Sequence, residues 1–139
     1  MKKILCLLLA VLMIFTLAGC SKLSRLENRM DKKVETMLNA LEAQDLGYAE
    51  KQLHPTTGKE SEAVKEGLQE MLALFEGKKI ESFALIEARA RKQNWAEHIV
   101  KGTASVTLDD GTVYRITYRY LDDGDTGFDS FKVQGHGVS

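Results

Sequence analysis

The stretch VKGTASVTLDDGTVYRITYRYL spans residues 100–121 and alternates between apolar and polar side chains on both sides of a short acidic turn. One face of its first half carries Val100, Ala104, Val106 and Leu108. One face of its second half carries Tyr114, Ile116, Tyr118 and Tyr120. The opposite face of the first half carries Lys101, Thr103, Ser105 and Thr107. The opposite face of the second half carries Arg115, Thr117 and Arg119. A period of two with one polar face is typical of an antiparallel hairpin whose second face meets water.

The turn at residues 109–111 sets how the two strands pair. A two-residue loop would place Val106 opposite Arg115 and mix the apolar face with the polar one. A three-residue loop with Gly111 in the left-handed conformation places Val106 opposite Tyr114 and keeps the apolar faces together. We predict this second register. It also pairs Ala104 with Ile116 and Gly102 with Tyr118.

Strands on either side extend the hairpin into a sheet. The alternation predicts four strands, over residues 80–91, 96–108, 112–121 and 128–134. The last strand should bring Phe131 opposite Tyr118 and Val133 opposite Ile116. Four consecutive strands joined by short loops form an antiparallel meander.

Residues before the sheet have helical periodicity. Apolar side chains three and four positions apart predict an amphipathic helix over residues 23–43, firm from Asp31, with a short coiled-coil seam as the alternative. A second helix over residues 46–53, capped by Asp45, ends before Pro55. The capping box at residues 57–60 predicts a third helix that runs to residue 76 and ends at Gly77. The fold class is therefore α+β, with about three N-terminal helices packed on one face of a four-stranded antiparallel meander.

The first twenty residues indicate where the protein resides. Residues 1–3 are positively charged, and residues 4–17 are apolar over a length shorter than the roughly 20 residues of a spanning helix. Leu17-Ala18-Gly19-Cys20 follows and resembles the bacterial lipobox. This resemblance implies cleavage between Gly19 and Cys20 and diacylglycerol on the Cys20 thiol. We expect a protein anchored by lipid to the cell membrane or the outer membrane, with its domain on the extracytoplasmic side; an uncleaved anchor is the alternative.

The leader divides the chain into four parts. We expect a signal peptide at residues 1–19, the lipidated cysteine with a short tether or helix start at 20–30, the α+β domain at 31–135 and a C-terminal tail at 136–139. Cys6 leaves with the leader and Cys20 is taken by lipid, so the mature domain has no disulfide.

Composition excludes some partners. The formal net charge is −1 before the two leader lysines are removed, which argues against a nucleic-acid partner and against a polybasic membrane-binding face. The three histidines lack zinc-ligand spacing, and the acidic loop 122–125 lacks the terminal glutamate of an EF-hand. We expect no metal and no cofactor.

The order of three helices and a meander resembles the NTF2-like α+β cone, in particular small lipoproteins of that superfamily with domains of unknown function. The resemblance covers about residues 31–134. Its best-matched piece is Gly127-Phe128-Asp129-Ser130-Phe131-Lys132-Val133, which looks like the closing strand of the family with Phe128 where Trp is usual. The resemblance implies a curved sheet wrapped around a cone-shaped cavity. Members include ketosteroid-isomerase-type enzymes, ligand binders, dimerisation modules and noncatalytic envelope domains, so the fold leaves the function open.

Four residues are candidates for a ligand site in such a cone: Tyr48, Gly102, Tyr114 and Tyr118. Gly102 should lie between Tyr118 on the third strand and Ala84 or a neighbour on the first strand. Small residues beside an aromatic ring would open a pocket there. The alternative is that Tyr118 packs over the glycine in the core, as aromatic rings do over glycines in sheets.

Acid–base chemistry has two possible sources. Isomerase-type chemistry needs a carboxylate base that faces a tyrosine donor, and the apolar face carries no carboxylate. His98 falls opposite Asp122 in the predicted register, as an acid–base pair or as a surface ion pair at a strand end.

A separate cluster of Arg89, Arg91 and Lys92 near Trp95 would contact a partner or lipid headgroups, or form the solvated rim of a hairpin.

From these features we expect a membrane-anchored envelope lipoprotein whose noncatalytic NTF2-like domain binds a partner protein or a small ligand. One alternative is a small isomerase or hydratase that uses a cavity tyrosine with a carboxylate, or with His98 and Asp122. Another is a structural homodimer through the open sheet face. Arg115, Thr117 and Arg119 make that face polar, so we expect a monomer or weak homodimer.

Overall fold

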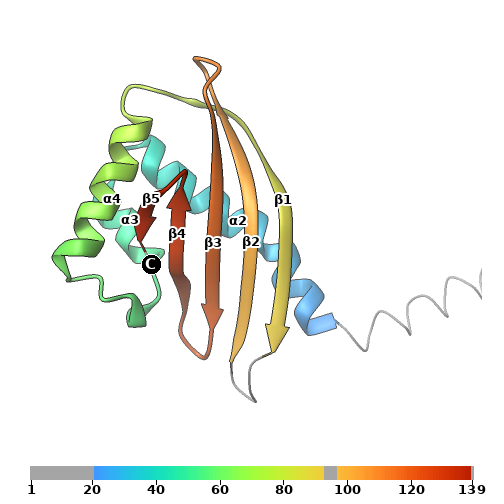
Figure 1. Ribbon diagram of the computed structural model, residues 1–139. Helices are drawn as coiled ribbons and strands as arrows, with labels where there is room; N and C mark the ends of the chain where they lie inside the picture. Colours follow the sequence, from blue (N-terminus) through green and yellow to red (C-terminus); the bar gives the residue numbers. More distant parts are fainter. Residues whose placement is uncertain (1–20, 93–96, 139) are drawn as a thin grey trace, which may run out of the picture.

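Helices come first in this protein and a sheet follows them. The computed structural model describes residues 21–92 and 97–138. The helical elements are α2 (Ser21–Glu42), α3 (Leu46–Lys51), the 3-10 helix η1 (Pro55–Thr57) and α4 (Glu62–Phe75). The strands are β1 (Ile80–Lys92), β2 (His98–Leu108), β3 (Val113–Asp122), β4 (Thr126–Val133) and β5 (His136–Val138). The predicted α+β class, with three α-helices before an antiparallel sheet, is confirmed in the described residues, and their sheet has five strands in the order β1-β2-β3-β4-β5 (Figure 1).

The hairpin of β2 and β3 has the predicted register. Val106 pairs with Tyr114 and Gly102 pairs with Tyr118. Gly111 has a φ of 87°, and its N–H donates to the Leu108 carbonyl at 3.0 Å, which closes the three-residue loop. The pairing of β3 with β4 is also as predicted, with Tyr118 opposite Phe131 and Ile116 opposite Val133.

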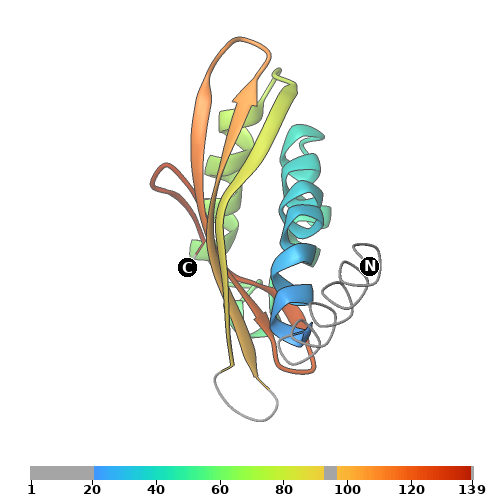
Figure 2. The same cartoon turned by 90° about the vertical axis from the view of Figure 1, so that its right-hand side faces the viewer.

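The apolar face of the sheet and the inner faces of the helices form one core. Side chains of α2 and α4 are buried in the same cluster as those of β2, β3 and β4. Its largest fully buried members include Tyr118, Phe75, Phe128, Phe131, Met30 and Met37. Both long helices therefore lie against one face of the sheet, and Figure 2 shows α2 along that side. The other face of β1, β2 and β3 carries the polar side chains, and we call it the open face.

The predicted start of the third helix is wrong. The helix is not capped by Thr57: Ser61 is its N-cap and accepts a hydrogen bond from the Val64 N–H at 3.2 Å. Residues 55–57 form η1 instead, and the Thr57 hydroxyl donates to the Phe128 carbonyl at 3.0 Å. Tertiary contact with β4 thus takes the hydroxyl that the capping box would have used.

The first strand pairs differently from the expectation. Gly102 lies opposite Ala88, not Ala84. The reason is the position of the hairpin, because β1 continues to Lys92 and Lys92 pairs with His98. A bulge between Leu85 and Glu87 further shifts the register along β1.

Residues 136–138, expected to belong to a tail, form β5. A left-handed turn at Gln134 and Gly135, with φ of 45° and 91°, returns the chain to β4. Val138 then pairs with Phe131 and is 2% exposed. Burial of this valine gives the short strand a place in the core that a stretch of only three residues does not indicate.

The free edge of β1 is covered by α2. The Ala90 N–H donates to Glu27 Oε1 at 2.8 Å, and the Ile80 N–H donates to Glu42 Oε2 at 2.5 Å. Unpaired N–H groups on an edge strand can form hydrogen bonds with a strand of another chain. The two carboxylates accept hydrogen bonds from two such N–H groups of β1.

The expected signal peptide and Cys20 lie outside the described residues, as does Trp95. Within residues 21–92 and 97–138, no helix combines the length and the apolar character needed to cross a membrane.

Candidate functional site

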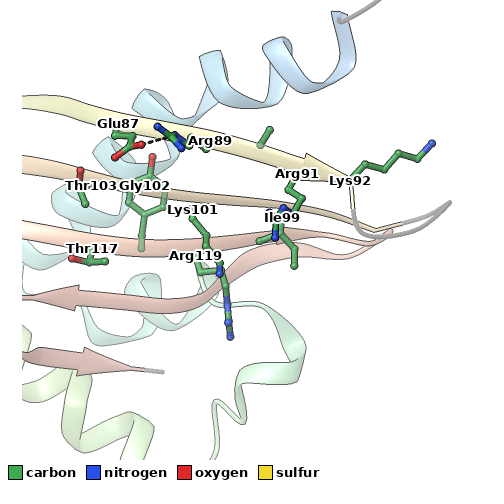
Figure 3. A pocket seen from close by; sticks show the side chains of 12 residues that line it. Glu87, Arg89, Arg91, Lys92, Ile99, Lys101, Gly102, Thr103, Thr117 and Arg119 are labelled. Carbon is green, nitrogen blue, oxygen red and sulfur yellow. Dashed lines mark ion pairs between the residues drawn. The ribbon is translucent and has the colours of Figure 1, made fainter.

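The open face contains a hollow of about 830 Å³ formed by three neighbouring strands. Figure 3 shows its labelled side chains, which come from β1, β2 and β3. Five of the residues that line it are cationic: Arg89, Arg91, Lys92, Lys101 and Arg119. One carboxylate, Glu87, also lines it. We refer to this feature as the cationic hollow.

Strand register places three of these cations in one row. Arg89 of β1 lies opposite Lys101 of β2, and Lys101 lies opposite Arg119 of β3. Directly opposed side chains in a sheet are close neighbours, and like charges in such positions oppose folding. A row of three cations is therefore a departure from ordinary sheet design, and such departures are expected at functional sites.

The two outer cations of the row have carboxylate partners. Arg89 Nε lies 2.5 Å from Glu87 Oε1 on the same strand, and both side chains are exposed. Arg119 is held more firmly, because its Nε donates to both oxygens of Asp129 at 2.7 and 2.8 Å. Its Nη2 also lies 2.6 Å from Asp129 Oδ2. This hydrogen-bonded carboxylate raises the pKa of Arg119 above its ordinary value.

A bulge in β4 makes the second partnership possible. Arg119 pairs with Ser130 while Tyr120 pairs with Phe128, so Asp129 is the extra residue between them. Bulges redirect side chains in this way. Asp129 is thereby presented to Arg119, and its side chain is 14% exposed.

Lys101, in the centre of the row, has no ion-pair partner in the part of the chain that the structure describes. Beside it, Thr103 and Thr117 face each other across β2 and β3 and also line the hollow. Lysine, arginine and hydroxyl groups together are donors for the oxygen atoms of phosphates, sulfates and carboxylates. The arrangement can therefore bind an anion.

Gly102 lies between the hollow and the core. The predicted contact with Tyr118 is present: a Cβ atom on Gly102 would overlap the hydroxyl of Tyr118. Tyr118 is 2% exposed, and its hydroxyl has no hydrogen-bond partner among the described residues. Burial raises the pKa of Tyr118 to about 12, so the phenol is neutral at physiological pH.

The other two candidate tyrosines lie elsewhere. Tyr48, on α3, is 43% exposed. Tyr114 packs against Phe75 with ring centroids 5.8 Å apart, and its hydroxyl lies 3.4 Å from the Leu74 carbonyl. The structure therefore brings Gly102 and Tyr118 together and leaves Tyr48 and Tyr114 apart from them.

The space beneath the apolar face contains packed aromatic rings. Phe128 makes edge-on contacts with Tyr118, Tyr120 and Phe131, with centroids 5.1 to 5.8 Å apart. Apart from the tyrosines, His54 is the buried polar side chain among the described residues. Tyr118 packs against these rings and also lines the hollow, as Glu87 does, but its hydroxyl forms no hydrogen bond with a described carboxylate.

The pair of His98 and Asp122 is opposite in register, as predicted. No hydrogen bond joins their side chains within the described residues.

The sequence pattern around His54, by contrast, predicts only the end of a helix. The structure makes this histidine the centre of a polar cluster that the sequence does not indicate.

His54 is 1% exposed and joins three segments. Its Nε2 donates to Asp123 Oδ1 at 2.8 Å. Its Nδ1 accepts from the Thr56 N–H at 3.2 Å, and the Thr56 hydroxyl lies 2.8 Å from the same nitrogen. The hydrogen bond from His54 lowers the pKa of Asp123. Because His54 also caps η1, this cluster fastens η1 to the β3–β4 turn rather than forming a catalytic triad.

No three His, Cys, Asp or Glu side chains converge as a metal site within residues 21–92 and 97–138.

Comparison of the chain with protein-family models, with curated proteins and with solved structures finds no significant match. The cationic hollow is therefore the feature of the described residues that points to a function.

Proposed function

We propose that this protein is an envelope lipoprotein, anchored through Cys20, whose domain is noncatalytic and binds an anionic ligand or partner on the open face. The signal peptide would occupy residues 1–19, and the membrane would be the cell membrane or the outer membrane. The domain would belong to the NTF2-like group. Three helices on one face of a meander, with a long bulged first strand, support that assignment.

One observation carries the binding proposal: Lys101 lies between Arg89 and Arg119 without a carboxylate of its own among the described residues. An anion bridging the row would relieve the repulsion between these neighbours and gain charge-assisted hydrogen bonds. Because the two arginines are already held by carboxylates, Lys101 is the side chain whose charge remains available.

The arrangement of polar groups supports a noncatalytic domain. Isomerase-type chemistry needs a base within hydrogen-bond reach of its donor. In the described residues, Tyr118 has no such partner and His54 is engaged with Asp123 and Thr56. Glu87 and Tyr118 both line the hollow, but no hydrogen bond joins the Tyr118 hydroxyl to a carboxylate in the described residues.

Titration of the mature protein in detergent with phosphate, sulfate and citrate tests the binding proposal. Lys101→Gln should weaken binding, measured by the chemical shifts of β2 amides. Lys132→Gln removes the same charge from the exposed Lys132 of β4, outside the hollow, and should leave the shifts unchanged. Equal loss in both variants, or no shift with any anion, would overturn it.

The anchor is tested separately by intact mass and by partition into membranes. Wild-type protein should carry the added mass of the lipid, and Cys20→Ser should lose it. Cys6→Ser is the matched control, because Cys6 belongs to the expected leader and should not affect lipidation. An unmodified Cys20 in the mature wild-type protein would contradict the anchor.

The enzyme is the second candidate, and the hydroxyl of Tyr118, unpartnered among the described residues, is the observation in its favour. A buried phenol without a partner is a ready hydrogen-bond donor to a carbonyl oxygen. The test is turnover of a panel of enolisable ketones and unsaturated acids. Activity in the wild type that Tyr118→Phe abolishes would replace the noncatalytic proposal with this one.

A further inference from the structure

We propose that the anion recognised by the cationic hollow is the phosphate of lipid headgroups in the same membrane that holds Cys20. This inference rests on the proposed function, since it needs both the anchor and the anion site. It names a specific occupant for the open face: the surface of an anionic phospholipid bilayer.

The cations at the end of β1 lie close to the start of helix α2. Helix α2 begins at Ser21, the residue after Cys20, and Glu27 of α2 accepts the hydrogen bond from Ala90 of β1. At 1.5 Å per residue, Glu27 lies about 9 Å along the helix from Ser21. Ala90 lies between Arg89 and Arg91, two of the cations in the hollow. Figure 1 shows the start of α2 beside the end of β1.

Salt screens the charge of a membrane surface, so the distance between the hollow and the anchor decides whether the cations are attracted to it. The Debye length is about 8 Å at physiological ionic strength. The hydrogen bond between Glu27 and Ala90 therefore holds the end of β1 about one screening length from the first residue after the anchor. Charges there experience the potential of an anionic membrane surface.

Positive and negative charges are separated at this end of the sheet. Arg91, Lys92 and Lys101 have no ion-pair partner among the described residues. The acidic turn at residues 122–125 lies at the same end, beyond β3, and there His54 pairs with Asp123. The cations of the hollow that have no described ion-pair partner therefore lie on β1 and β2.

The hydrogen-bond donors of the hollow are side chains and not backbone N–H groups. The central strands of the hollow use their backbone N–H groups in the pairing of β1 with β2 and of β2 with β3. The hollow therefore offers side-chain cations spread over an open surface, and not an enclosed nest of backbone donors. Several separated charges suit a surface of many phosphates better than one small free anion.

The experiment uses the complete lipidated protein in nanodiscs. Trp95 is the single tryptophan of the chain and follows Lys92, the last residue of β1, by three positions in the sequence, so it serves as the fluorescence probe. Nanodiscs of phosphatidylcholine with a headgroup spin label are compared with nanodiscs that also contain phosphatidylglycerol. Quenching of Trp95 should increase with phosphatidylglycerol and should be reversed by salt.

Charge-matched variants locate the effect. R91Q/K101Q removes two cations from the hollow, and R115Q/K132Q removes two from the same face outside it. Each cation near an anionic surface contributes about a fivefold change in equilibrium. The first variant should lose most of the phosphatidylglycerol-dependent quenching, and the second should keep it. Equal quenching with and without phosphatidylglycerol, or equal losses in the two variants, would refute headgroup docking.

A parallel titration with free glycerol phosphate separates the two proposals. Shifts of β2 amides with glycerol phosphate, without any effect of phosphatidylglycerol on Trp95, would retain the anion site and reject the membrane as its source. No response to either probe would reject both. A response to phosphatidylglycerol that R91Q/K101Q abolishes supports both.

Discussion

Tyr118 and Gly102 pack so closely that the Tyr118 hydroxyl occupies the place of a Cβ atom on Gly102. The two residues pair across β3 and β2. The backbone oxygen of Glu87 closes the same space from β1, 2.5 Å from that position. Because Gly102 also lines the cationic hollow, this contact connects the apolar core with the candidate site.

Gly102→Ala should lower the free energy of unfolding by about 1–3 kcal/mol, the usual cost of overpacking. The new methyl group would meet both a ring and the backbone of β1. Urea denaturation measures the change. Gly47→Ala is the control, since the nearest atom to its Cβ position is 3.7 Å away and alanine favours helix. Wild-type stability of Gly102→Ala would show that β1 and Tyr118 can move apart.

Tyr118→Phe should leave stability at neutral pH unchanged or raise it by up to about 1 kcal/mol. The reason is that a buried hydroxyl without a partner among the described residues loses its bonds to water and gains none in the fold. Tyr114→Phe, which removes a hydroxyl with an acceptor at Leu74, should instead lower stability. Chemical denaturation compares the two variants, and a marked loss in Tyr118→Phe would reveal a partner for its hydroxyl.

The same phenol should make the fold sensitive to alkali. Burial raises the pKa of Tyr118 from 10.0 to about 12. The unfolded chain therefore releases this proton at lower pH than the native protein, and the unfolded state is favoured as pH rises. Stability should be unaffected below pH 10 and should fall between about pH 10 and 12. Unfolding curves for Tyr118→Phe should lack this component; identical curves for both proteins would contradict the assignment.

Acid should weaken the contact between η1 and the β3–β4 turn. The hydrogen bond from His54 lowers the pKa of Asp123, so the unfolded chain takes up this proton first as pH falls. The stabilisation is present above the unfolded pKa of about 4 and is lost as pH falls below it. Asp123→Asn should be less stable than wild type at neutral pH, and the difference should disappear in acid. Asp125→Asn, in the same turn, serves as the control.

Loss of the Glu27 carboxylate should expose the edge of β1. In Glu27→Ala, the Ala90 N–H loses its acceptor, and hydrogen exchange at Ala90 should become faster. Glu35→Ala, on the exposed side of the same helix, should not change it. If exchange at Ala90 is unchanged in both variants, α2 is held against β1 by apolar packing alone.

Strand pairing was predictable where alternation and turn chemistry agreed. The loop at residues 109–111 allows one register that keeps the apolar faces together, and that register by itself places Lys101 opposite Arg119. The pairing of β1 was not predictable in the same way. Its hairpin connection carries no comparable turn signal, so the position of Arg89 opposite Lys101 depends on the tertiary structure.

The sequence indicated only part of the candidate site. Arg89, Arg91 and Lys92 stand close together in the chain and were recognised as a basic cluster, but the formal charge of −1 gives no reason to expect that Lys101 and Arg119 join them. The alternation of side chains sends lysine and arginine of three strands to one face, while much of the acidic charge lies in helices and turns. Charge segregation is thus a property of the folded sheet and not of the composition.

Local patterns in the chain were enough for the α+β class, the order of the elements and the central register, because each depends on neighbours in sequence. The contact of His54 with Asp123, the capping of the β1 edge by Glu27, the strand at residues 136–138 and the row of three cations all join residues distant in the chain. Such contacts depend on how the helices and strands pack together, which short-range periodicity does not encode.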